Sequence, residues 1–249
     1  TGDNNTAVGH NALYATTTPN DNVAIGHNAL YTNTTGGSNI AVGSYALDAA
    51  VDGVSNAVAI GYAALGANTH SGSGTTPCVA VGHNALGADT SGVNNVAVGA
   101  WSLDANTTGS SNVAMGSSAL SANTTAGSNV AIGNAALVTN TTGASNVAVG
   151  ASAFYANTTA SNGTAVGHVA LSANTTGAHN CAFGYGALDA NTTASHNNAF
   201  GYDALGVNTT GANNVAMGNY TGDAVTTALG NVLYGYAAGS AITTGGYNV

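Results

Sequence analysis

A short apolar stretch that ends in glycine recurs along the whole chain. It consists of an alanine between two larger apolar residues, as in VAVG at 96–99 and VAIG at 130–133. Alignment on the glycine gives 14 repeats spaced by 17 residues, except for one step of 18 (Gly43 to Gly61) and one of 21 (Gly61 to Gly82). This regularity predicts a stack of equivalent units.

The order of apolar residues within one repeat predicts a short strand. Alternation places Val96 and Val98 on one face and Ala97 on the other. Alanine holds the central position in 13 of the 14 repeats, with Leu233 as the exception, which indicates a tight space. A second apolar pair such as Ala119-Leu120 and a turn sequence of the Asn-Thr-Thr type follow. We therefore predict two strands and two turns in each repeat.

Two strands and two turns in 17 residues predict one coil of an all-β, parallel β-solenoid (β-roll) with about 14 coils. At about 4.8 Å per coil the rod would be roughly 65 Å long. Glycine and Asn-Thr-Thr recur too often for helices. Within the 21-residue step, we expect a bulge from the turn near Ser71 to Thr75, with the strands still in register.

The repeats divide the chain into a regular and a variant part. Residues 1–217 form the regular 17-residue-repeat solenoid, whereas Gly222 and Gly239 replace the usual leucine in the last two repeats. Val225 and Ile242 follow three residues later, so the apolar residue has moved along the coil. We predict that 218–249 are variant terminal repeats leading to another module.

Both faces of the predicted strand are apolar, and only one can fill the interior of the coil. The other would form a continuous stripe larger than a soluble monomer normally exposes. Since every coil repeats the same surface, the natural partner is another copy, and a closed ring of identical chains would bury the stripe.

The strings NVAVG, NVAIG and NIAVG followed by x-x-Ala-Leu resemble the head repeats of trimeric autotransporter adhesins (YadA-like heads). The longer string NVAIGHNALYTNTTGGSN resembles the tandem repeats of trimeric phage tail-fibre and related surface-fibre proteins. The resemblance covers essentially the whole chain, although the 17-residue repeat of this chain is longer than the repeat of the adhesin heads. It implies an intertwined homotrimer with a left-handed β-roll, extracellular on a virion tail fibre or a bacterial cell surface. The implied function is a structural, adhesive shaft or head with multivalent receptor binding.

Composition narrows the choice of partners. The chain has no Lys or Arg, and nine Asp residues give a net charge of -9. Nucleic acid is therefore excluded as a partner, because phosphate neutralisation needs cations. No apolar run approaches the roughly 18 residues of a membrane span, so we expect no membrane insertion by this segment. Without ion pairs between side chains, added salt should change stability little.

The sequence offers no catalytic constellation. The aspartates are scattered without paired spacing, and no serine stands in a nucleophile-elbow context. We predict no enzyme activity, catalytic residue or cofactor. Four histidines follow the repeat glycine and could present rings to a metal: His10, His27, His83 and His168. Because the same position also holds Ser44 and Asn134, we interpret it as a tolerant surface position and predict no metal site.

Aromatic residues at variable positions are candidate surface contacts for a cell-surface glycan or protein receptor. They are Tyr14, Tyr31, Tyr45, Tyr62, Trp101, Tyr155, Tyr185 and Tyr202. Alternatively, each ring packs over the neighbouring coil.

Eight Asn-Thr-Thr turns are formal glycosylation acceptors. Their asparagines are Asn33, Asn106, Asn123, Asn140, Asn157, Asn174, Asn191 and Asn208. Turn geometry explains them without a sugar, and a glycan-coated extracellular filament remains an alternative. The threonines also form a hydroxyl ladder of the kind used by ice-binding solenoids, although only one of two adjacent residues can face outward.

The two cysteines, Cys78 and Cys181, lie six repeats apart, or roughly 29 Å at the coil spacing. A disulfide requires Cα atoms within about 7 Å. We therefore expect two reduced thiols and no intrachain bond. Cys181 replaces the usual valine, so we expect it to act as a small buried hydrophobic residue.

Overall fold

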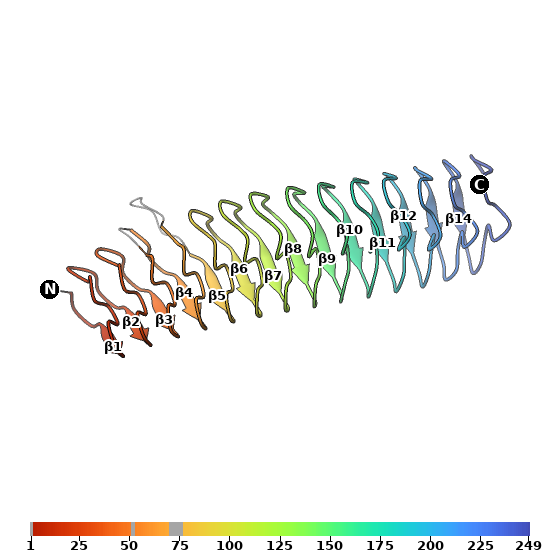
Figure 1. Cartoon of the computed structure of the whole chain (residues 1–249). Coiled ribbons are helices and arrows are strands. Elements are labelled where there is room, and N and C mark those ends of the chain that lie inside the picture. The colour runs from red at the N-terminus through yellow and green to blue at the C-terminus, as the bar shows by residue number, and fades with distance from the viewer. Residues whose placement is uncertain (1, 51–52, 70–76) are drawn as a thin grey trace. The chain divides into compact units, whose positions relative to one another are not determined.

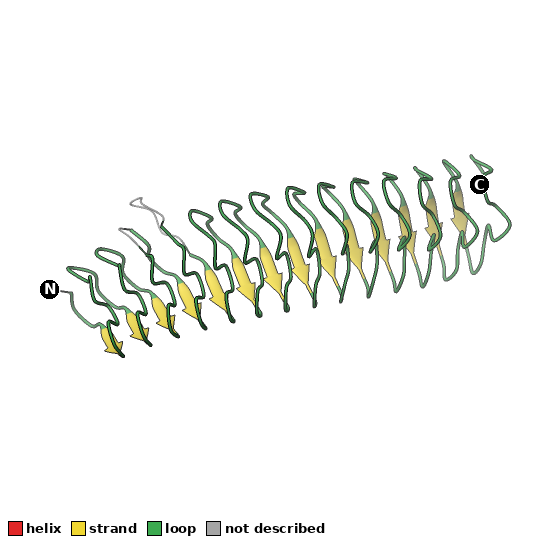
Figure 2. Cartoon of the chain, in the orientation of Figure 1, coloured by secondary structure: helices red, strands yellow, loops and turns green. Residues whose placement is uncertain are grey.

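The computed structural model describes residues 2–50, 53–69 and 77–249. The chain divides into two compact units, Thr1–Gly127 (unit 1) and Ser128–Val249 (unit 2). In the described part, the secondary structure consists of fourteen three-residue strands joined by turns, without a helix (Figure 2).

Within each unit the strands form a parallel sheet in chain order (Figure 1). The strands of unit 1 are β1 (Thr6–Val8), β2 (Val23–Ile25), β3 (Ile40–Val42), β4 (Val58–Ile60), β5 (Val79–Val81), β6 (Val96–Val98) and β7 (Val113–Met115). Those of unit 2 are β8 (Val130–Ile132), β9 (Val147–Val149), β10 (Thr164–Val166), β11 (Cys181–Phe183), β12 (Asn198–Phe200), β13 (Val215–Met217) and β14 (Val232–Tyr234). The predicted parallel β-solenoid is confirmed. We number each coil by its strand and begin it one residue before that strand, so coil 5 comprises 78–94.

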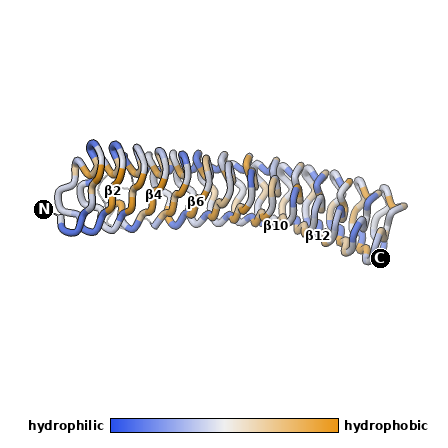
Figure 3. Tube along the Cα trace, turned by 90° about the horizontal axis from the view of Figure 1, so that it is seen from below, coloured by the Kyte–Doolittle hydropathy of each residue, from blue (hydrophilic) through white to orange (hydrophobic). Residues whose placement is uncertain are grey.

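The strands alternate as predicted. The central alanine points into the coil and is fully buried, as Ala24 and Ala148 show. The first and third strand residues, which we name the outer columns, face away from the interior; Val23 is half-buried and Ile25 is exposed. The tube in Figure 3 is orange along strands such as β2 and β4, where these apolar residues stand.

The second predicted strand does not form. Leu120 and Leu137 are buried, but their φ angles of 53° and 52° are left-handed rather than extended. The neighbouring coils still pair here through the backbone, since the N–H of Leu103 donates to the carbonyl of Ala119 at 2.9 Å. Each described coil therefore has one strand, and the Ala-Leu pair lies in a turn that directs leucine inward.

The repeat glycine is required by the stacking of the coils. Gly150 has a φ of 137°, and a Cβ atom there would lie 2.5 Å from the carbonyl oxygen of Gly167 in the next coil. Both the backbone conformation and the close approach therefore exclude other residues.

Two columns of buried asparagine side chains cross-link the coils. In the turn asparagine column, formed by the Asn-Thr-Thr asparagines, Asn191 Nδ2 donates to Asn174 Oδ1 at 2.6 Å. In the pre-strand asparagine column, formed by residues directly before each strand, the N–H of Asn197 donates to Asn180 Oδ1 at 2.9 Å. Asn197 Nδ2 also donates to the carbonyl of Gly211 at 2.8 Å. Most of the described buried amides are thus satisfied from coil to coil, whereas Asn157 Oδ1 and Asn208 Oδ1 have no hydrogen-bond partner.

Larger and smaller interior residues compensate for each other. Phe154 replaces the usual leucine of coil 9, and Gly163 replaces the pre-strand asparagine of coil 10. A Cβ atom on Gly163 would collide with the Phe154 ring. Likewise, a Cβ atom on Gly239 would lie 2.6 Å from Cδ1 of Leu233, the one departure from the alanine column. Interior volume is therefore shared between adjacent coils at Phe154 and Gly163, and within one coil at Leu233 and Gly239.

The two irregular regions keep the strand register. Val58 pairs with Val79 across the 21-residue step, so the predicted register is confirmed, whereas the bulge expected near Ser71 to Thr75 lies outside the described residues. Near the C-terminus, β13 and β14 also stay in register, and Val225 is buried in the turn asparagine column. The transition to another module at 218–249 remains a prediction.

Candidate interaction surfaces

The outer columns give each unit an apolar face. In unit 1, Ile25, Ile60 and Met115 are 40%, 39% and 41% exposed. In unit 2, Phe183 and Met217 are 37% and 42% exposed. None of the fourteen described strands contains a charged residue. We call this surface the outer apolar face. Its third-residue column is apolar or aromatic in every described strand, and its first-residue column is polar only at Thr6, Thr164 and Asn198.

Two rows of rings follow the repeat glycines, one in each unit, with one ring per coil. The unit 1 row consists of His10, His27, Tyr45, Tyr62, His83 and Trp101, with ring centroids 5.1–5.8 Å apart. The unit 2 row consists of His168, Tyr185, Tyr202, Tyr220 and Tyr236, with centroids 5.1–6.0 Å apart. The alternative interpretation, in which rings pack over neighbouring coils, is confirmed for those candidate contact residues that belong to the rows.

The structure thus groups most of the predicted contact residues. Five belong to the rows: Tyr45, Tyr62, Trp101, Tyr185 and Tyr202. Tyr14 and Tyr31 stack on each other at 5.3 Å, and Tyr155 lies apart from the rows, 45% exposed.

The rows are not visible as units in the sequence, because their rings occupy two positions of the repeat. Tyr45, Trp101 and Tyr220 stand two residues after the glycine, and the other ring residues stand one residue after it. The two positions together give one ring per coil in coils 1–6 and 10–14, and none in coils 7–9. Where rings stack nearly parallel, as His10 and His27 do at 7°, their faces cover each other, so a partner meets ring edges rather than open faces.

The eight turn asparagines are fully buried. Their amides bond inside the coil, as Asn123 Nδ2 does to the carbonyl of Ala126 at 3.0 Å. In the folded coil these amide nitrogens are out of reach of a sugar-transferring enzyme, which favours the turn interpretation.

The paired threonines divide as predicted. The first residue of most pairs is half-buried, and several donate their hydroxyl to the next coil, as Thr192 does to the carbonyl of Thr209 at 3.2 Å. Exceptions include the Thr34 hydroxyl, which has no partner among the described residues, and Thr243, which is exposed. The second residue of each pair is exposed. In unit 2 these exposed residues are Thr142, Thr159, Thr176, Thr193, Thr210, Thr227 and Thr244. One hydroxyl per coil therefore faces outward.

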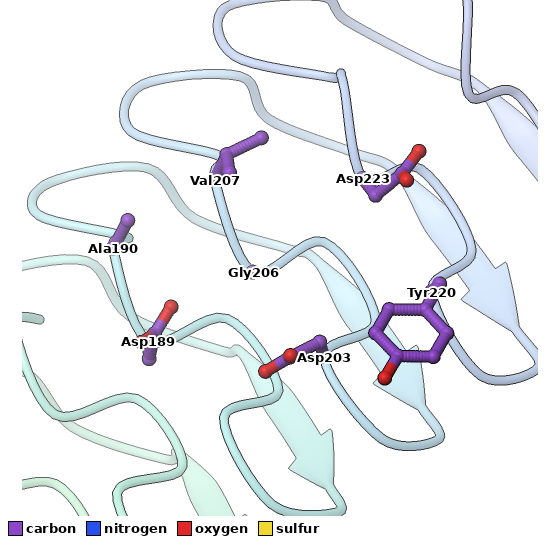
Figure 4. Close-up of a pocket in the computed structure, with 7 residues that line it drawn as sticks. All are labelled: Asp189, Ala190, Asp203, Gly206, Val207, Tyr220 and Asp223. Carbon is purple, nitrogen blue, oxygen red and sulfur yellow. The ribbon is translucent and has the colours of Figure 1, made fainter. Parts of the chain in front are cut away.

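Unit 2 contains a pocket of about 450 Å³ lined by three aspartates from successive coils (Figure 4). Asp189, Asp203 and Asp223 are joined there by Tyr220 and by three small residues, Ala190, Gly206 and Val207. Burial raises the pKa of Asp189 above its usual value, and the charge of Asp203 raises it further. Repeat spacing alone did not reveal this grouping, because Asp189 and Asp223 share one repeat position two coils apart, whereas Asp203 of the coil between them stands at another.

Both thiols are free. Cys78 is fully buried in the pre-strand asparagine column, where its Sγ donates to the carbonyl of Gly92 at 3.4 Å. Cys181 begins β11 in an outer column and is only half-buried. The expectation that Cys181 fills the core is therefore wrong, because the alternation of the strand directs its side chain outward.

The described residues contain neither a metal-binding cluster nor a membrane-spanning helix, and comparison with known proteins gives no match. Among the described residues, no group of three His, Cys or Asp side chains is arranged to hold a metal, and no helix is long and apolar enough to cross a membrane. Comparison with protein families, curated proteins and solved structures finds no match.

Proposed function

We propose that this chain is a rigid, adhesive fibre segment that assembles with further copies of itself, as a homotrimer, through the outer apolar face. The observation that carries the proposal is the pair of apolar outer columns on successive strands, with side chains such as Ile132 and Phe183 more than a third exposed. A face of this kind exceeds the apolar patches that soluble monomers leave open.

The charge distribution supports self-association. The strands carry no charged residue, so the nine aspartates would not be forced together by a contact along the strands. A three-fold closed ring follows from the resemblance of NVAVG and NVAIG to trimeric adhesin heads and tail fibres, and so does an extracellular place on a virion or a bacterial surface. In such a fibre the backbone and asparagine ladders supply stiffness. The aromatic rows would be presented three times, so a glycan or protein receptor would be held by avidity.

The oligomeric state tests this proposal. We expect the wild-type protein to show the mass of a trimer by light scattering at micromolar concentration, and the Ile132→Asp/Phe183→Asp variant to be monomeric, because both charges would be buried at the contact. The control Thr142→Asp/Thr193→Asp adds the same charge to the same two coils at exposed threonines and should stay trimeric. A monomeric wild type, or a folded trimer of the face variant, would refute the proposal.

Ice binding is a second candidate, favoured by the single file of exposed threonines in unit 2. It predicts inhibition of ice recrystallisation that is lost on Thr159→Lys/Thr176→Lys. Activity that survives this substitution would exclude the threonine column as the ice surface. A glycan coat on the turn asparagines is disfavoured by their burial, and an intact mass equal to that of the bare chain would dismiss it.

A further inference from the structure

The interior of coil 5 differs from that of the coils around it. Cys78 takes the pre-strand asparagine position and Asp89 takes the turn asparagine position. Both side chains are fully buried. Asp89 stands between Asn68 of coil 4 and Asn106 of coil 6. A carboxyl group thus replaces an amide inside a column of amides.

The hydrogen bonds change direction at Asp89. In the regular column the later coil donates to the earlier one, as Asn123 Nδ2 does to Asn106 Oδ1 at 3.0 Å. Asn106 Nδ2 donates to Asp89 Oδ1 at 2.7 Å in that same direction. Asn68 Nδ2, however, donates to Asp89 Oδ2 at 3.2 Å in the opposite direction. Two amide donors thus converge on Asp89, and each of its carboxyl oxygens accepts one hydrogen bond.

Among the described residues, no cation lies against Asp89. The chain has no Lys or Arg, and the carboxyl is held by the two asparagine amides and the backbone N–H of Gly92. The neighbouring coils face it with these uncharged amides. Within its own coil the titratable group nearby is Cys78, whose pKa burial raises to about 12, so the thiol stays protonated and neutral.

We propose that Asp89 is a proton-operated junction that fastens coil 5 into unit 1 when protonated and loosens it when ionised. With the proton on Oδ2, the hydroxyl donates to Asn68 Oδ1 after the Asn68 amide turns by half a rotation, and the column then runs in one direction. Loss of the proton to water leaves a buried anion held by neutral donors alone. This inference concerns one coil interior and does not depend on the proposed assembly.

The direction in which pH changes the stability of coil 5 follows from the raised pKa of Asp89. Burial raises the pKa of Asp89 to about 7, whereas an aspartate in an unfolded chain has a pKa of about 3.9. The stabilising effect of the proton is therefore fully present below about pH 4, is lost as the pH rises to about 7, and changes little above that.

Hydrogen exchange tests the junction in the full chain. After correction for intrinsic exchange, we expect the opening of coil 5 to increase by more than about tenfold between pH 5 and pH 8. Coil 7, residues 112–128, serves as the internal reference because it has no titratable side chain. Asp89→Asn should abolish the increase, whereas Asp223→Asn, which removes an exposed carboxylate, should keep it.

A transfer experiment covers the case in which Asp89→Asn does not fold. Asn174→Asp places a carboxyl in the same column of unit 2, between Asn157 and Asn191, and should create a new pH-dependent opening at coil 10. Infrared difference spectra should show a protonated carboxyl band at pH 5 in the wild type that is absent from Asp89→Asn. Opening of wild-type coil 5 that does not vary with pH, an Asp89→Asn variant with the wild-type profile, or no new opening in Asn174→Asp would overturn the proposal.

Discussion

The longest run of the turn asparagine column within either unit lies in unit 2, where Val225 and Ile242 end it near the C-terminus, whereas the column of unit 1 is interrupted repeatedly. In unit 2 it runs without a break from Asn140 to Asn208, whereas in unit 1 Thr16, Ala50 and Asp89 occupy the same position. Both units nevertheless keep the repeat glycine, the buried strand alanine and the parallel register in nearly every coil. The comparison indicates that glycine and alanine define the coil, while the asparagine column adds stability where it is continuous.

The largest expected effect is at the repeat glycine, and it should be the same in both units. Gly43→Ala and Gly150→Ala each place a Cβ atom against the glycine backbone of the next coil at a φ above 130°. We expect each to lower the free energy of unfolding by about 3 kcal/mol or more, measured by chemical denaturation. Gly206→Ala is the control, since its Cβ would meet nothing closer than 3.3 Å. A mild loss at Gly43 alone would show that unit 1 stacks by different rules.

A smaller effect should separate the two units. Asn174→Ala removes the acceptor of the Asn191 amide and the donor to the carbonyl of Gly177. Asn33→Ala removes only bonds to Gly36 of its own coil, because Ala50 follows it in the column. We expect the Asn174 variant to lose about 1 kcal/mol more than the Asn33 variant in local opening free energy by hydrogen exchange. Equal losses would mean that contacts between coils contribute nothing to the column.

Added salt should have the smallest effect. The chain has no Lys or Arg, so there are no Lys or Arg ion pairs that salt could weaken. Salt only relieves the repulsion among aspartates such as Asp189 and Asp203. We expect the melting temperature to hold or rise slightly between low and moderate salt. A marked drop in melting temperature would contradict this expectation, because the composition provides no attractive charge pairs that salt could weaken. A larger rise in the stability of unit 2 than of unit 1 would locate the repulsion in the acidic pocket of unit 2.

The sequence was sufficient for the strand and the stacking, because Val-Ala-Val alternation and a fixed glycine spacing each have one simple structural explanation. It was insufficient for the Ala-Leu pair, since a left-handed leucine such as Leu120 is stabilised by contacts with adjacent coils that no local propensity encodes. The aromatic rows and the acidic pocket were missed for a related reason. Their members come from different positions of successive repeats, and only the three-dimensional stack brings them together.

The exchange of volume between Phe154 and Gly163 bears on how such a chain can grow. Duplication of a regular 17-residue repeat inserts a coil that packs against the coils on both sides without any further change. A gene for such repeats can therefore lengthen by duplication. Phe154 and Gly163 belong to different coils, however, and a copy of coil 9 alone would place the ring against the asparagine that ordinarily precedes a strand. Coils 9 and 10 therefore constitute one heritable unit of two repeats, which duplication or recombination preserves only if it moves them together.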